Sequence, residues 1–157
     1  MAEEMLEYDG ISKITQIDWS YTAINLLEKA NQERGNTVIT TKQMDARRLD
    51  FANNTFDVVI DKGLLDALTC GDGAHANINM MLEEAHRVLK PQGVFFCLSR
   101  AVESKRKDKY MKKPEKFNWR VKTQMIQKPG IGAVMKAITQ VKKSDKKNFH
   151  FLYICKK

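Results

Sequence analysis

Cysteine and histidine are scarce in this chain, and neither is spaced for metal binding. Its 157 residues include three of each, with no Cys-x-x-Cys pair and no metal-ligand spacing among the histidines. We therefore expect no metal site. The odd number of thiols at Cys70, Cys97 and Cys155 predicts reduced cysteines in a cytoplasmic or nuclear protein.

Long apolar runs and a basic leader are also missing. No apolar stretch is long enough to span a membrane, so we expect no membrane partner. The first ten residues carry four acids and no basic residue, which argues against a signal peptide. Apolar residues make up 43% of the chain, which argues against disorder, and the length of 157 residues predicts a single domain, 1–157.

Positive charge is abundant but unevenly distributed. The formal net charge is +8, and lysine and arginine are dense in residues 100–122 and 142–147. These stretches fit solvated loops or helix faces. They also fit a surface for an anionic partner, either an acidic protein face, RNA or a ribosome. No RNA-binding module signature accompanies them, which makes RNA the weaker of these partners.

Strand and helix patterns alternate along the first two thirds of the chain. The predicted strands are residues 12–18, 37–44, 56–60 and 94–99. The predicted helices are residues 3–8, the segment from the N-cap Ser20 to Gly35, and residues 76–90. Such alternation predicts a parallel sheet. Strand 56–60 lacks polar alternation, which predicts burial on both faces.

The pattern changes after Arg100. Residues 101–113 predict a charged helix or loop, and residues 118–126 alternate as a half-buried antiparallel strand does. Residues 133–141 predict a strand or a short helix, and residues 148–155 predict the closing strand. The last third therefore adds antiparallel strands to a parallel sheet.

Three predicted strands lead into an acid at or just beyond their carboxyl ends: Asp18, Asp45 and Asp61. In open α/β sheets, ligands bind at the carboxyl ends of the strands. Three acids at that edge suggest a site for a nucleoside. The only close glycine pair before the last third, Gly71 and Gly73, does not open a helix after a strand, so we interpret it as a surface turn.

Four segments carry a resemblance to a known family. They are Ile-Asp-Trp-Ser, Met-Asp-Ala-Arg-Arg-Leu-Asp-Phe, Thr-Phe-Asp-Val-Val-Ile-Asp-Lys-Gly-Leu-Leu-Asp-Ala-Leu and Glu-Ala-His-Arg-Val-Leu-Lys-Pro-Gln-Gly. Together they resemble the seven-strand, S-adenosylmethionine-dependent methyltransferases. The Asp-Lys-Gly-x-x-Asp-Ala-Leu part resembles the eukaryotic branch that methylates lysines of elongation factor 1-alpha and citrate synthase. The likeness is continuous over residues 1–100 and looser over 117–125 and 148–155.

This resemblance implies an α/β, Rossmann-like class I methyltransferase sandwich with antiparallel C-terminal strands. It implies S-adenosylmethionine as cofactor and methyl transfer to a protein lysine, with a translation factor as the protein partner. Residues 1–100 would form the cofactor-binding half, and residues 101–157 the basic, substrate-side part. The other hypothesis is an inactive methyltransferase-like binding module that uses its basic C-terminal face for a protein or RNA partner.

One family feature has no counterpart here. Family members begin with a strand and a Gly-x-Gly loop that holds the methionine part of the cofactor, whereas the start of this chain resembles the helix after that loop. We expect an N-terminally truncated fold in which the first central strand is absent. The strands that end at Asp18 and Asp61 would then expose unpaired edges, and cofactor binding would be weak.

The resemblance also assigns the cofactor-binding residues. Asp18 would accept hydrogen bonds from the ribose hydroxyls, and Trp19 would lie against the adenine ring. Asp45 would accept from the adenine amino group, and the Ala46 N–H would donate to a ring nitrogen. The structural alternatives are a turn or helix-capping role for Asp18, core packing for Trp19 and an Asx-turn for Asp45.

Asp61 and Lys62 are the candidate catalytic residues. Asp61 would border the methyl-transfer zone, contact the cofactor and orient the substrate lysine. Lys62 would act directly or would position Asp61 and the start of the next helix. Because methyl transfer disperses charge, we expect most of the rate to come from alignment in a dry pocket. Asp66 fits a structural role.

Overall fold

A computed structural model describes residues 2–6, 11–127 and 149–157 of the chain. Its residues group into two compact units, Met1–Asp50 and Phe51–Lys157. Each unit contains strands with helices packed against them. The single domain expected over residues 1–157 stays a prediction.

The first unit contains a two-stranded parallel sheet. Strand β1 (Ile14–Asp18) pairs with β2 (Ile39–Gln43), and helix α2 (Tyr21–Glu33) connects them. Ser20 caps α2 by accepting a hydrogen bond from the Ala23 N–H at 3.3 Å, as its sequence position predicts. Gly35 follows the helix with φ of 65°, which confirms its predicted place at the helix end.

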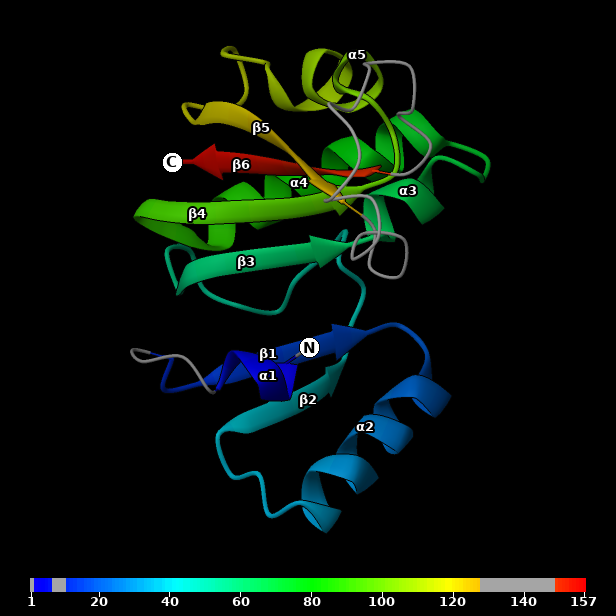
Figure 1. The fold of residues 1–157 in the computed structure, drawn as a ribbon, viewed down its shortest axis with the longest axis vertical. Helices are drawn as coiled ribbons and strands as arrows, with labels where there is room; N and C mark the ends of the chain where they lie inside the picture. The colour runs from blue at the N-terminus through cyan, green and yellow to red at the C-terminus, as the bar shows by residue number, and fades with distance from the viewer. Residues whose placement is uncertain (1, 7–10, 128–148) are drawn as a thin grey trace, which may run out of the picture. The chain divides into compact units, whose positions relative to one another are not determined.

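The second unit is a four-stranded sheet in the order β3-β4-β6-β5 (Figure 1). Strands β3 (Phe56–Lys62) and β4 (Leu89–Ser99) run parallel, as the alternation of strands and helices predicts. Strand β6 (Phe149–Lys156) is antiparallel to both β4 and β5 (Arg120–Gln127). The predicted antiparallel addition to a parallel sheet is therefore confirmed.

Two helices cover one face of this sheet. They are α3 (Leu64–Leu68) and α4 (Ala74–Val88), and Figure 1 shows α4 behind β4 and β6. Apolar positions of α4 repeat at helical spacing and meet the inward residues of the strands. The buried side chains on this side include Leu65, Ile78, Met81, Leu82, Ala85, Phe95, Cys97, Phe151, Tyr153 and Cys155.

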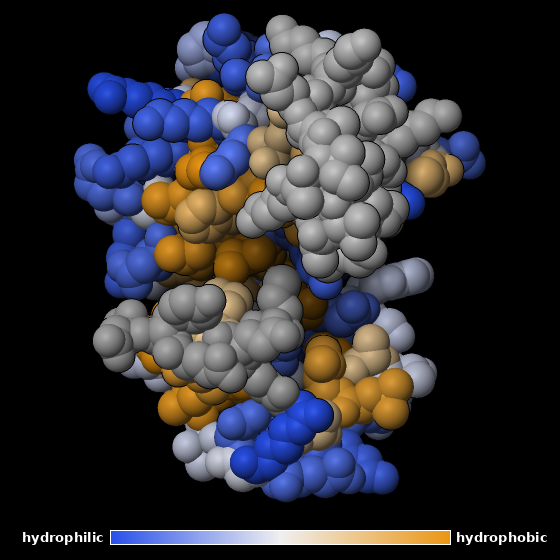
Figure 2. Space-filling view, viewed as in Figure 1, coloured by the Kyte–Doolittle hydropathy of each residue, from blue (hydrophilic) through white to orange (hydrophobic). Residues whose placement is uncertain are grey.

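The prediction that strand 56–60 is buried on both faces is wrong. Val58 is 44% exposed and Ile60 is 40% exposed. The register aligns these residues with Val94 and Phe96 of β4, on the face away from α3 and α4. Figure 2 shows apolar atoms over β3 and β4 on this face. An uninterrupted apolar run cannot reveal whether a second layer covers the sheet.

Strands β1 and β3 are each paired on one side only among the described residues, as are β2 and β5. Strand β1 pairs with β2, and β3 pairs with β4 at the end of the four-stranded order. Each therefore leaves one row of backbone N–H and C=O groups without a partner strand in its own unit. This agrees with the expectation of unpaired edges on the strands that end at Asp18 and Asp61.

The remaining segments agree in part with the sequence patterns. Helix α1 covers Ala2–Met5, whereas the rest of the predicted helix 3–8 falls largely outside the described residues. Residues 101–113 include α5 (Glu103–Arg106) and the π-helical turn η1 (Lys107–Met111). The expected element at 133–141 lies outside the described residues. No helix in the described ranges is long and apolar enough to cross a membrane.

Candidate functional site

Asp18 lies at the carboxyl end of β1, where the chain turns into α2. Its Oδ1 accepts a hydrogen bond from the Ser20 N–H at 2.8 Å, which confirms a turn role for this carboxylate. Its Oδ2 has no donor within the described part of the chain. One oxygen of the half-buried Asp18 thus forms the turn, and the other can accept a ligand hydroxyl.

Trp19 presents its indole ring to solvent beside Asp18. The residue is 79% exposed, so the alternative of core packing is wrong. Its backbone carbonyl accepts a hydrogen bond from Gln43 Nε2 at 3.0 Å, and the Met44 N–H donates to the Asp18 carbonyl at 2.9 Å. These bonds connect the ends of β1 and β2 and hold the two strand ends at one edge.

Asp45 is held by its neighbour Arg47. The Arg47 backbone N–H donates to Asp45 Oδ1 at 2.9 Å, which forms the Asx-turn given above as the structural alternative. The guanidinium contacts both carboxylate oxygens, with Nη2 at 2.7 Å from Oδ2. The side-chain bond from Arg47 lowers the pKa of Asp45. An adenine amino group would have to share this carboxylate with Arg47.

The Ala46 N–H is a second polar group at this edge. It has no acceptor among the residues that the structure describes, and Ala46 itself is half-buried. An N–H in this position retains its capacity to donate to a ligand ring nitrogen. The expected nucleoside edge thus has one open acceptor at Asp18 and one open donor at Ala46.

Asp61 ends β3 with its carboxylate turned into the protein. The residue is only 6% exposed. Oδ1 accepts from the Leu64 N–H at 2.8 Å, and Oδ2 accepts from the Leu65 N–H at 3.2 Å. These are first-turn amides of α3, which lack intrahelical acceptors. Asp61 therefore caps the helix from three residues upstream of its first residue, across Lys62 and Gly63.

The buried thiol of Cys97 is the third donor to Asp61. Sγ lies 3.1 Å from Asp61 Oδ2, and the two residues are register partners across the β3–β4 pair. Burial raises the pKa of Asp61, and it does so despite the opposing hydrogen bonds from Cys97, Leu64 and Leu65. Burial also raises the pKa of Cys97 far above its ordinary range, so the thiol stays protonated and donates.

Gly63 makes the tight exit from β3 possible. Its φ is 86°, a left-handed conformation that other residues adopt only with strain. Its N–H donates to the Leu98 carbonyl at 3.2 Å, so the turn remains attached to β4. Lys62, the residue before it, is exposed. The Asp-Lys-Gly order thus places an inward carboxylate, an outward amine and a left-handed turn in succession.

Asp66 is the centre of a buried ionic network. Its Oδ1 accepts from Ser99 Oγ at 2.5 Å and from Arg106 Nη2 at 2.9 Å. Its Oδ2 accepts from the Arg100 N–H at 2.8 Å. Burial opposes ionisation, but the bonds from Arg100, Ser99 and Arg106 outweigh it and lower the pKa of Asp66. The structural role expected for Asp66 agrees with this geometry.

Sequence reasoning missed Arg106 as a member of this network. Arg106 lies in the basic segment 100–122, which fits solvated charge, yet the residue is buried and paired with Asp66. No local signal distinguishes it from the lysines beside it. Other cations of the segment also have partners within the fold: Lys107 with Glu103 at 3.5 Å and Lys116 with Glu83 at 2.6 Å.

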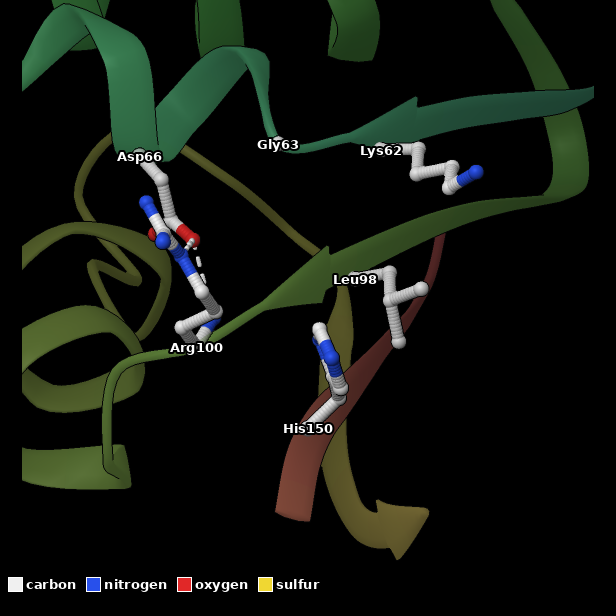
Figure 3. A pocket seen from close by; sticks show the side chains of 6 residues that line it. All are labelled: Lys62, Gly63, Asp66, Leu98, Arg100 and His150. Carbon is white, nitrogen blue, oxygen red and sulfur yellow. Dashed lines mark hydrogen bonds and ion pairs between the residues drawn. The ribbon is translucent and has the colours of Figure 1, made fainter. Parts of the chain in front are cut away.

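A cleft opens where β3, β4 and β6 meet α3. Its volume is about 240 Å³, and its lining residues are Lys62, Gly63, Asp66, Leu98, Arg100 and His150. In Figure 3, Asp66 and Arg100 stand at one end of the cleft and Lys62 at the other, with Leu98 and His150 between them. His150 was also missed. It alternates with Phe149 and Phe151 and so lies on the opposite side of β6 from them. This alternation could have indicated that His150 lies apart from the core residues of the strand.

Comparison with known proteins decides the family. The family model described as a methyltransferase domain matches residues 1–97, more than half of the chain. This chain belongs to that methyltransferase family. The matched residues include the edge at Asp18 and Asp45 and the Asp61 turn. The cofactor of this fold family is S-adenosylmethionine, as the resemblance implied.

Two curated relatives carry related functions in their names. An eEF1A lysine and N-terminal methyltransferase of Danio rerio is 38% identical over 98 residues, which cover 61% of this chain and 14% of the relative. An EEF1A lysine methyltransferase 4 of Bos taurus is 34% identical over 101 residues, which cover 59% of this chain and 38% of the relative. The matched segment therefore spans well under half of either relative.

A solved structure supports the fold. A SAM-dependent methyltransferase from Methanosarcina mazei superposes with a TM-score of 0.62 at 16% identity, covering 98% of this chain and 86% of that one. The Rossmann-like methyltransferase fold expected from the sequence is thus confirmed. At this identity the likeness concerns the fold alone.

The residues at the β1–β2 edge fit the nucleoside part of S-adenosylmethionine. The open Oδ2 of Asp18 matches a hydroxyl donor, and the open Ala46 N–H matches a ring nitrogen. The exposed Trp19 ring offers a stacking face. Asp45 can accept from the adenine amino group only if its carboxylate is shared between adenine and Arg47.

Proposed function

We propose that this protein transfers a methyl group from S-adenosylmethionine to a lysine of a protein substrate, and that the substrate is a translation factor of the elongation factor 1-alpha kind. The observation that carries the proposal is the pair of eEF1A lysine methyltransferase relatives at 38% and 34% identity. The family match over residues 1–97 includes the segment with the nucleoside edge and the Asp61 turn. The whole-protein activity is part of the proposal, because the chain spans 14% and 38% of these relatives.

In this proposal the residues of the first unit hold the nucleoside. Asp18 Oδ2 accepts from the ribose, the Ala46 N–H donates to adenine, and the Trp19 ring covers one adenine face. Asp45 accepts from the adenine amino group and shares its carboxylate with Arg47. The Asp45–Arg47 pair is partly exposed, so sharing this carboxylate with a ligand costs little.

The residues of the second unit organise the transfer zone. The bound cofactor supplies an activated methyl group, so the protein needs to align the amine and exclude water. Asp61 contributes by fixing the start of α3 through the Leu64 and Leu65 N–H groups. Lys62 and Gly63 then form the exposed part of the turn. Asp61 thus acts as a positioning residue, and its direct contact with substrate or cofactor stays a prediction.

The cofactor part of the proposal is tested by calorimetric titration of the purified protein with S-adenosylmethionine and S-adenosylhomocysteine. Asp18→Ala removes the open acceptor and is expected to weaken binding by ~1–3 kcal/mol. Glu28→Ala, which changes an exposed acid on α2, is the matched control and should bind as the unchanged protein does. Equal affinities for all three proteins would contradict the nucleoside assignment.

The substrate part is tested by transfer of a labelled methyl group to elongation factor 1-alpha. We expect label on a lysine side chain, located by mass spectrometry of the digested product. Replacement of that lysine by arginine should remove the label. Label on another residue type, or none in the presence of bound cofactor, would contradict lysine methylation and leave the cofactor assignment standing.

A further inference from the structure

The cleft beside the Asp61 turn has an unbalanced charge. Lys62 at the end of β3 and Arg100 after β4 are its cations, and Leu98 of β4 supplies an apolar wall. Lys62 forms no ion pair with any acid whose side chain the structure describes. Asp66 is the only carboxylate among the described residues that line the cleft.

Asp66 does not neutralise these two cations. Its Oδ1 is bonded to the buried Arg106, and its Oδ2 accepts from the Arg100 backbone N–H. The Arg100 guanidinium lies further away, with Nε 3.8 Å from Asp66 Oδ2, and its side chain is 76% exposed. The contact is longer than a hydrogen bond, so most guanidinium donors of Arg100 remain available. Figure 3 shows this pair at one end of the cleft and Lys62 at the other.

Such a cleft suits a carboxylate on a short apolar stem. A carboxylate can accept from the guanidinium at one end of the cleft or from the ammonium at the other, and its methylene groups can pack on Leu98 between them. The same two cations disfavour the ammonium of a substrate lysine. The target lysine and the occupant of this cleft are therefore different groups.

We propose that this cleft binds an acidic side chain of the protein substrate, a glutamate or aspartate close in sequence to the methylated lysine. The inference rests on the proposed function and adds a substrate preference to it. Lys62 and Arg100 are then specificity-determining residues that select acidic sequence around the target. The amino-acid end of the cofactor also carries a carboxylate. The test therefore has to distinguish an acidic side chain of the substrate from the carboxylate of the cofactor.

The test measures peptide binding by fluorescence anisotropy in the presence of S-adenosylhomocysteine. One labelled ten-residue peptide carries a lysine flanked by glutamates, and its partner carries glutamines in their place. The acidic peptide is expected to bind at least tenfold more tightly. Lys62→Gln and Arg100→Gln should each weaken it severalfold, and the double variant should remove the preference. Lys112→Gln, an exposed lysine outside the cleft, is the control and should retain it.

Other outcomes overturn the proposal. Equal binding of the acidic and glutamine peptides would show that the protein has no preference for acidic sequence. Variants that weaken S-adenosylhomocysteine binding but not peptide binding assign the cations to the cofactor carboxylate. Tighter binding of a single-stranded RNA than of the acidic peptide, lost in the same variants, assigns them to phosphate. A preference without lysine methylation would instead contradict the proposed function and leave the cleft's ligand class in place.

Discussion

The Cys97 thiol donates to the Asp61 carboxylate at 3.1 Å, and both side chains are buried where β3 and β4 end. The same carboxylate accepts from the Leu64 and Leu65 N–H groups, so one acid connects two strands to the start of α3. The position that the family resemblance assigns to catalysis is thus also a helix cap. Changes at Asp61 should therefore affect both stability and turnover, and the two effects have to be measured separately.

We predict that Asp61→Ala lowers the free energy of unfolding by ~1–3 kcal/mol, because it leaves two first-turn amides of α3 without acceptors. Chemical denaturation followed by circular dichroism measures this. At saturating cofactor and substrate, turnover should also fall. An unchanged unfolding free energy would show that Asp61 does not stabilise α3.

The raised pKa of Asp61 predicts a specific pH dependence. Burial raises this pKa above its unfolded value, so the folded state binds the proton more tightly. The stabilising contribution of the protonated form is present below the unfolded pKa and is lost as pH rises through the folded pKa. Asp61→Asn cannot titrate. The unfolding free energy of the unchanged protein, minus that of Asp61→Asn, should therefore fall as pH rises from about 4. A difference that is flat with pH would contradict the raised pKa.

The Asp66–Arg106 pair should contribute strongly to the free energy of unfolding. Its contribution is lost as pH falls, whereas that of Asp61 is lost as pH rises. Both side chains are buried, so Asp66→Ala leaves Arg106 without its carboxylate and should cost ~3–5 kcal/mol. The pKa of Asp66 is lowered, so its contribution is present above the unfolded pKa and is lost as pH falls through the folded pKa. Thermal and denaturant unfolding at two pH values measures this. A double-mutant cycle with Arg106→Met isolates the pair, and zero coupling would contradict the contact.

Gly93 predicts a packing defect. A Cβ at this position would lie 2.9 Å from both Leu89 Cδ2 and the Lys90 carbonyl oxygen. Gly93→Ala should therefore lower the free energy of unfolding by ~1–3 kcal/mol. Gly71→Ala is the matched control, because nothing lies within 4 Å of its added methyl group. Equal stability of the two variants would contradict the close approach of the chain at Gly93.

Arg47 offers a test of the adenine assignment. Arg47→Ala releases Asp45 from its ion pair, and we expect tighter S-adenosylhomocysteine binding. Calorimetric titration measures the change. If Arg47→Ala and Asp45→Ala both leave the affinity unchanged, Asp45 forms the Asx-turn alone and does not contact adenine.

Much of the fold could be predicted from local pattern. The capping by Ser20, the left-handed Gly35 and the parallel pairing of β1 with β2 and of β3 with β4 agree with the sequence. Each depends on residues close in sequence or on hydrophobic periodicity, and both are visible in a single chain. The strand-end acids were found for the same reason, since each follows directly on a strand pattern.

Only the tertiary structure decided what these residues contact. Asp61 turns inward because the amides of α3 and the Cys97 thiol of β4 donate to it, and Cys97 is 36 positions away. Arg106 is buried because Asp66, 40 positions earlier, neutralises it. Val58 and Ile60 are partly exposed although the apolar run predicts burial. The sequence by itself determined which side chains stand at the strand ends. The direction in which each side chain points, its bonding partners and its burial depend on distant residues that a local pattern does not encode.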